Sequence, residues 1–140
     1  MSGVYTLVSF AHFLTSQVLT LKQHNYNSLH KASNALKEQM VDYIGTYDYA
    51  PPRLKPATIA RKATGDSPLL ETGELRDSIQ ANNDTTGAMV GSDNPKAQWH
   101  VLGTVTIPPR DFMTAAAIAR EDEIIEILGD LSSWYLTAGA

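Results

Sequence analysis

The side chains that could carry chemistry in this 140-residue chain are its four histidines and its scattered carboxylates. No two histidines form an H-x3-H pair, and no pair encloses a glutamate as the helix of a metalloprotease does. Cysteine is absent, so neither a disulfide framework nor a thiolate metal site is available. We therefore expect neither a metal ion nor a cofactor at His12, His24, His30 and His100.

Other sets of residues that resemble catalytic groups have a simpler structural interpretation. His100 and Asp111 would need a serine to form a nucleophilic triad, but no G-x-S-x-G motif holds a nucleophile. Glu71 and Glu74 are three residues apart, which is more typical of an acidic first helical turn than of an acid/base couple. Residues 87–91 have neither the lysine nor the spacing of a phosphate-binding loop. The sequence thus predicts that this protein is not an enzyme.

The charged residues are distributed unevenly along a chain whose formal net charge is −4. Residues 53–80 contain five cations and four anions, whereas residues 113–140 contain one cation and five anions. One interpretation is that both segments are solvated faces, and the other is that they attract each other between neighbouring copies. The overall acidity argues against a dedicated nucleic-acid binder, although it leaves local basic patches open.

The elements that must position these groups begin with a helical segment over residues 1–46. Apolar residues recur every three or four positions from residue 4 to residue 21, which predicts an amphipathic helix rather than a membrane span. A polar stretch around Asn25 interrupts this stripe, and Gly45 is expected to end the segment. The segment is either one long bent helix or a pair of helices, of which Ser28 caps the second.

Short elements are expected through the middle of the chain. They are one or two helical turns over residues 54–62, a short helix capped by Thr72, strands at residues 80–83 and 88–90, and a helix over residues 95–102. Trp99 and Leu102 are expected in the core, because they lie on one helical face at i and i+3.

A single closing helix is expected over residues 111–136, directly after two prolines. The chain is then one domain, residues 1–140, of the α+β class. A long N-terminal helix or helix pair and the C-terminal helix pack on a small antiparallel sheet. The expected inner side of the closing helix consists of Phe112, Ala115, Ala116, Ala119, Ile125 and Leu128.

Three ordered motifs, PLLETGELRDSI, WHVLGT and IPPRDFM, resemble those of the tailed-phage virion morphogenesis proteins, the neck or tail-completion proteins of the head–tail junction. The preceding LKPATIARK resembles the corresponding segment of Mu-type members, so the likeness covers about residues 53–113. Many members carry a Tyr-Ala pair where this chain has Lys96 and Ala97, and Trp99 is expected to fill the space of that tyrosine. The family pattern falls on Leu70, Thr72, Gly73, Leu75, Ser78, Ile79, Gly91, His100, Gly103, Pro109, Arg110 and Phe112.

The resemblance implies a non-enzymatic structural protein that forms a homo-oligomeric ring between the head and the tail tube. Its partners would be its own copies and other neck, portal-adaptor and tail proteins, with DNA passing through the ring without sequence-specific binding and with no membrane involved. It would be made in the host cytoplasm and lie at the head–tail junction of the virion. The alternatives are a tail terminator or another connector ring, and a small nucleic-acid-binding module.

The distribution of charge indicates which surfaces would serve such a ring. DNA must pass through without being held, so the acidic helix or the hairpin loop at residues 83–87 is expected to face the lumen. The acidic residues in question are Glu121, Asp122, Glu123 and Glu126. The cations expected to meet a neighbouring subunit or a partner ring are Arg53, Lys55, Arg61, Lys62 and Arg110. The positions expected to hold the fold are Leu70, Thr72, Gly73, Leu75, Ile79, Trp99, Gly103, Pro109 and Phe112.

Overall fold

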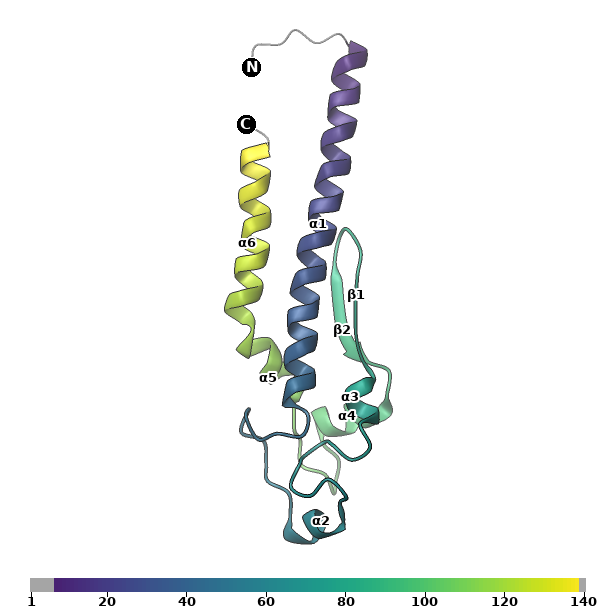
Figure 1. Ribbon diagram of the computed structural model, residues 1–140, viewed down its shortest axis with the longest axis vertical. Helices are drawn as coiled ribbons and strands as arrows, with labels where there is room; N and C mark the ends of the chain where they lie inside the picture. Colours follow the sequence, from purple (N-terminus) through teal and green to yellow (C-terminus); the bar gives the residue numbers. More distant parts are fainter. Residues whose placement is uncertain (1–6, 139–140) are drawn as a thin grey trace.

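The computed structural model describes the backbone of residues 7–138 and the side chains of residues 18–129. It confirms the α+β class, with a long N-terminal helix, C-terminal helices and a two-stranded antiparallel sheet (Figure 1). Within the described part of the chain, no helix combines the length and apolarity needed to cross a membrane. The elements in chain order are α1 (Leu7–Tyr43), α2 (Pro56–Arg61), α3 (Glu74–Asp77), β1 (Ile79–Asn83), β2 (Ala88–Ser92), α4 (Pro95–Leu102), α5 (Phe112–Ala119) and α6 (Glu121–Ala138).

Helix α1 is one continuous helix of 37 residues, about 55 Å long at 1.5 Å per residue. The polar stretch around Asn25 does not break it, because these residues bond to the β-hairpin. The Asn25 side chain donates to the carbonyl of Thr85 at 3.3 Å, and the Asn83 side chain donates to the carbonyl of Tyr26 at 3.2 Å. Ser28 is buried within the helix and caps no second helix.

Helix α1 lies between two neighbours, with α6 antiparallel to it on one side and the hairpin on the other (Figure 1). Small side chains are buried along this part of α1, namely Ala32, Ser33 and Ala35. The Ser33 hydroxyl donates to the carbonyl of His30 at 3.1 Å, so its burial leaves no unpaired donor. Small residues on both sides allow the two neighbours to approach the α1 backbone closely.

The predicted hairpin is confirmed, with longer strands than expected. Strands β1 and β2 pair from Ile79 opposite Ser92 to Asn83 opposite Ala88. The Asp84 carboxylate closes the connecting turn by accepting backbone N–H groups of Thr86 and Gly87, at 2.7 and 2.9 Å. This is the turn chemistry that short polar side chains favour.

The hydrophobic core lies at the C-terminal end of α1. Phe112 is 0% exposed, and it packs in one cluster with Met40 of α1, with Ile44 just after that helix, and with Leu75 and Ile79 of the motif region. Beyond this core, α1 and α6 continue side by side as a two-helix extension, and the hairpin covers the other side of α1 over part of its length (Figure 1). The molecule is therefore elongated, with its packed centre near one end.

The expectation that Trp99 and Leu102 belong to the core is wrong. They are 48% and 68% exposed, whereas Ala97 is buried and Val101 packs against the core. Helix α4 uses the i,i+4 pair instead of the i,i+3 pair. The small side chain at Ala97 brings the α4 backbone close to the core, which turns the larger residues outward.

The prediction of a single closing helix is also wrong, because the chain bends at Arg120 between α5 and α6. The Arg120 side chain donates to the Gln39 side chain of α1 at 2.9 Å, which fixes the bend against the central helix. The break shifts the helical phase, so Ile127 becomes the buried position on α6. Three residues expected on the inner side are exposed, namely Ala119, Ile125 and Leu128.

The amphipathic stripe expected over residues 4–21 lies mostly outside the described side chains. Within them, Val18 is exposed and Leu21 is half-buried. The stripe is expected to be buried against the domain or a partner; the domain does not cover Val18, and burial against a partner stays a prediction. As predicted, α1 ends just before Gly45, whose φ of +90° is left-handed and whose N–H donates to the carbonyl of Pro68 at 2.7 Å.

Candidate functional site

A cleft of about 590 Å³ lies at the end of the molecule that carries α2. Its walls are α2 with the residues around it, the loop before α3, the helix α4 and the segment before α5. Two carboxylates, Glu71 and Glu74, line it together with six cations, so we call it the basic cleft. Its cations are Arg53, Lys55, Arg61, Lys62, Lys96 and Arg110.

Arg110 holds the basic cleft together from inside. Its side chain is buried, and its guanidinium donates to the carbonyls of Pro52 and Arg53 at 2.8 and 3.3 Å. Its backbone N–H donates to the carbonyl of His100 at 2.6 Å. One residue thus joins the proline linker, α4 and the start of α5. The expected contact of Arg110 with a neighbouring subunit stays a prediction, although the buried guanidinium is already bound within the chain.

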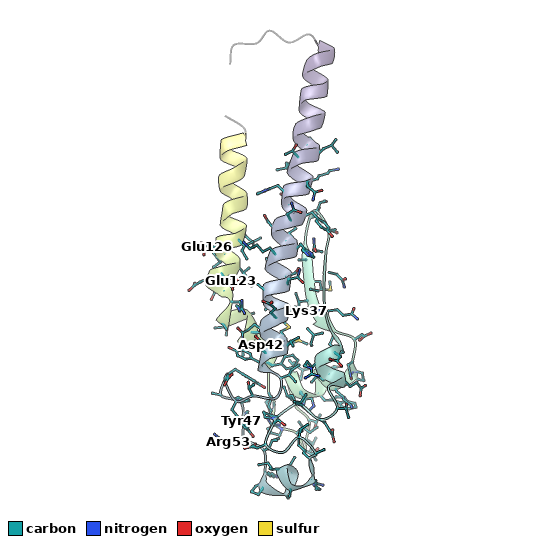
Figure 2. All side chains as sticks on the ribbon, in the orientation of Figure 1. Lys37, Asp42, Tyr47, Arg53, Glu123 and Glu126 are labelled. Atoms are coloured by element: carbon teal, nitrogen blue, oxygen red, sulfur yellow. The ribbon has the colours of Figure 1, made fainter. Side chains whose placement is uncertain are left out.

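The linker before α2 is fixed by Tyr47. The Tyr47 hydroxyl donates to the Asp66 carboxylate and accepts the backbone N–H of Leu54 at 3.1 Å. The Arg53 guanidinium lies 4.6 Å from the centre of the Tyr47 ring, within the range of a cation–π contact. These contacts fix the backbone of the linker that carries Arg53, the first cation of the cleft (Figure 2).

Four cations of the cleft form no ion pair with a described carboxylate, namely Lys55, Arg61, Lys62 and Arg110. Of these four, Arg110 is bound by backbone carbonyls instead. The Arg61 side chain donates to the carbonyl of Ala57 at 3.2 Å, which orients it along its own helix. Lys96 is the opposite case, since its ammonium lies 3.0 Å from the Glu74 carboxylate. The unpaired positive charge is therefore concentrated around α2.

The interior of the cleft disfavours further positive charge. Burial lowers the pKa of the Lys62 ammonium, the Glu71 carboxylate opposes this, and the Arg110 guanidinium adds to it. Burial also lowers the pKa of His100, with smaller effects from Arg110, Lys62 and Lys96. The His100 Nδ1 atom is buried and has no hydrogen-bond partner among the described residues. An anion in the cleft would favour the protonated forms of Lys62 and His100.

Thr72 and Gly73, which belong to the motif, form part of the cleft wall. Helix α3 begins one residue later than expected, because Gly73 occupies the capping position with a φ of +85°. The Thr72 hydroxyl accepts the backbone N–H of Glu74 at 3.4 Å, so it still supports the first turn. The left-handed φ of Gly73 is the reason why glycine is suited to this turn.

The other motif positions serve the fold in different ways. Leu75, Ile79 and Phe112 are core residues, and Leu70 packs against the core. Gly103 ends α4 with a φ of +77°. Pro109 is exposed, and Trp99, described above, is half-exposed on the outer face of α4.

The acidic residues of α6 lie apart from the basic cleft. Glu123 and Glu126 are on the side of the molecule that α6 forms, whereas Arg53 is near the α2 end (Figure 2). Glu121, Asp122, Glu123 and Glu126 are all exposed. The Arg120 guanidinium lies 2.7 Å from the Glu123 carboxylate, and the other three acids form no ion pair with the described side chains.

Sequence reasoning grouped Arg53, Lys55, Arg61 and Lys62, and the structure brings these four into one cleft. It missed Lys96 and His100, which α4 contributes from more than thirty residues further along the chain. No short-range sequence pattern links these two residues to the four cations around α2. The only sequence signal is the motif order, which makes α4 follow the hairpin.

The described side chains contain no group of three or more histidines, aspartates or glutamates arranged to hold a metal ion. No family model, curated protein or solved structure matches this chain.

Proposed function

We propose that this chain is a structural protein of a tailed phage that forms a ring at the head–tail junction, as a neck or tail-completion component. The three ordered motifs that resemble this family suggest the position in the particle. The physical support is independent of that resemblance. It comes from the shape of the molecule and from the side chains that it leaves uncovered.

The observation that carries the proposal is the two-helix extension beyond the core. Large apolar side chains are exposed along it, including Val18 and Leu19 on α1 and Ile125 and Leu128 on α6. We expect partners to cover these exposed side chains. Long helices with a small core at one end suit a subunit that gains much of its burial from neighbouring copies.

The net charge also fits a ring around DNA. Each cation that contacts a phosphate adds affinity that falls with salt, and a channel for DNA should avoid such contacts. A subunit with a net charge of −4 meets this need, provided that its basic cleft faces protein rather than the lumen. A tail terminator of similar size would make the same contacts and differ only in its place in the particle.

The experiment is electron microscopy of phage particles assembled with and without this chain. We expect labelled copies at the head–tail junction, and unjoined heads and tails when the chain is missing. Complete, joined particles without it would overturn the proposal.

The basic cleft, with Tyr47 beside Arg53, also favours a second candidate, a nucleic-acid-binding module. A DNA-binding titration at increasing salt separates the two candidates. Measurable affinity that falls steeply with salt indicates the module, and the absence of binding indicates the ring.

A further inference from the structure

The basic cleft is electrostatically incomplete within one chain. Among the described side chains, Lys55, Arg61 and Lys62 form no ion pair. Of the two carboxylates in the cleft, Glu74 is already paired with Lys96, so only Glu71, which acts on Lys62, is left to balance these cations. The buried, unpartnered Nδ1 atom of His100 lies in the same wall. Such a site is completed by carboxylate groups from outside, because they supply both negative charge and hydrogen-bond acceptors.

An acidic face on α6 has the matching properties. Helix α6 packs on α1 through Ile127, which is buried, and Ile124, which is half-buried. At 100° per residue, Asp122, Ile125 and Glu126 lie on the opposite face, at i, i+3 and i+4. We call these three residues the acidic face. All of them are exposed, and neither carboxylate is paired with a described side chain.

The helix itself accounts for only part of this acidity. Asp122 stabilises the positive N-terminal end of α6, as acids in a first helical turn do. Glu126 lies beyond the first turn, where this effect fades. Ile125 is 59% exposed between the two acids, and nothing in the stability of the helix requires an apolar residue there.

We propose that the basic cleft of one copy of this chain binds the acidic face of α6 in the next copy. Asp122 and Glu126 would meet the cations on and around α2, mainly Arg61 and Lys62. Ile125 would contact the apolar part of the cleft wall, to which Leu54, Leu69, Ile107 and Pro108 contribute. The volume of about 590 Å³ is within the range of pockets that enclose a ligand of several side chains, ~300–1,000 Å³.

The placement of the two surfaces makes the contact intermolecular. The α2 end projects beyond the C-terminus of α1, whereas α6 starts beside α5 and runs away from that end (Figure 1). The cleft and the acidic face are different patches, so each bound copy leaves one of each unfilled. A contact of this heterologous kind generates a closed ring or an open filament. The inference rests on the proposed ring, and it assigns the acidic face to a neighbouring subunit rather than to the lumen.

The test uses two charge-reversed forms of the full chain, one for each surface. The cleft variant carries Arg61→Glu and Lys62→Glu, and the face variant carries Asp122→Lys and Glu126→Lys. Reversal on one side places like charges opposite each other. We expect each variant alone to need about tenfold or more protein for half of the chains to assemble, as measured by mass photometry and native mass spectrometry.

The decisive experiment is to mix the two variants in equal amounts. The reversed cleft then meets the reversed face of the other variant, and each unreversed surface meets its natural complement. We expect assembly to return towards the wild-type concentration range, in oligomers that contain both variants. A control with Glu38→Lys and Asp42→Lys reverses two exposed acids at the same i,i+4 spacing on α1, and it is expected to assemble as the wild type does.

Circular dichroism and thermal unfolding of each variant establish that it is folded. If the wild type assembles and both reversed forms assemble equally well, or if mixing restores nothing, the cleft-to-face contact is overturned while the ring stands. A wild type that stays monomeric at every concentration overturns the proposed function as well.

Discussion

At the scale of single residues, Arg110 shows how this small fold accommodates a buried charge. Its guanidinium is surrounded by backbone carbonyls of the proline linker rather than by a carboxylate. Carbonyl oxygens satisfy its N–H groups without adding a second ion that would also have to be desolvated. The residue therefore belongs to the framework of the cleft, and the flexible-looking linker before α2 is tied to α5 through it.

Replacing Arg110 should destabilise the protein more than replacing any other cation of the cleft. Arg110→Ala leaves two carbonyls without their donors and opens space inside, so we expect a loss of about 2–3 kcal/mol in the free energy of unfolding. Arg53→Ala is the matched control, because the Arg53 side chain is 76% exposed and a change below about 0.5 kcal/mol is expected. Urea denaturation followed by circular dichroism measures both, and equal losses would contradict the framework role.

Tyr49 predicts a dependence of stability on alkaline pH. Burial raises its pKa to about 12 from 10.0, with Arg110 opposing the shift and Asp111 adding to it. Between these pH values the unfolded chain releases the proton and the folded chain retains it. The stability contributed by this group is therefore complete below pH 10 and falls as the pH rises towards 12.

Tyr49→Phe should flatten this part of the pH profile. The Tyr49 hydroxyl is buried and has no hydrogen-bond partner among the described residues, so its removal should cost little near pH 7. The ring contact with Tyr43, with centroids 5.0 Å apart, does not need the hydroxyl. Thermal unfolding of both proteins from pH 8 to pH 12 measures the effect, and parallel curves would show that another group is responsible.

At the scale of elements, local signals predicted most of the structure. The hairpin follows from turn residues between two short runs, and α4 begins with the Asn94 side chain accepting the N–H of Lys96 at 3.0 Å. These features depend on residues within four positions of one another. The sequence left open whether α1 is one helix or a pair, and it did not predict the bend at Arg120, because contacts with the hairpin and with Gln39 decide them.

In the candidate site, too, one part was predictable from the sequence and another part was not. The cations around α2 are close in sequence, so their grouping was visible in the sequence. The burial of Arg110 and the contribution of His100 depend on contacts between the segment before α5, α4 and the proline linker, which no local pattern encodes. The inner face of α6 was mispredicted for the same reason, since a bend set by packing shifted the helical phase.

The turn that ends α4 gives the prediction at this scale. Gly103 has a φ of +77° and a ψ of 168°, a region open essentially to glycine alone. A Cβ atom there would lie 3.0 Å from the carbonyl oxygen of Ile107 and from Pro109. Gly103→Ala should therefore lower the free energy of unfolding by about 1–3 kcal/mol in urea denaturation.

Gly87→Ala is the control for that substitution. A Cβ atom at Gly87 meets nothing within 4 Å, and its φ is outside the left-handed range. We expect a change within about 0.5 kcal/mol. A loss at Gly87 as large as that at Gly103 would mean that the close contacts with Ile107 and Pro109 are not the cause.

At the scale of the whole molecule, the fold separates a packed end from an extended end. The core and the basic cleft lie at the C-terminal end of α1, the hairpin runs along the middle of this helix, and the two-helix extension continues beyond the core (Figure 1). Apolar residues exposed on the extension and unpaired cations in the cleft both indicate surfaces that are completed by other molecules. A self-assembling structural subunit accounts for both features with a single kind of partner.

The measurement that tests this most directly is the mass of the purified wild-type protein by native mass spectrometry and sedimentation, over a wide range of concentration. The account predicts a closed oligomer with one defined number of copies, at least three, because the proposed contact joins two different patches. Electron micrographs of the same sample should show rings. A monomer at every concentration, or a dimer that does not grow, would contradict it.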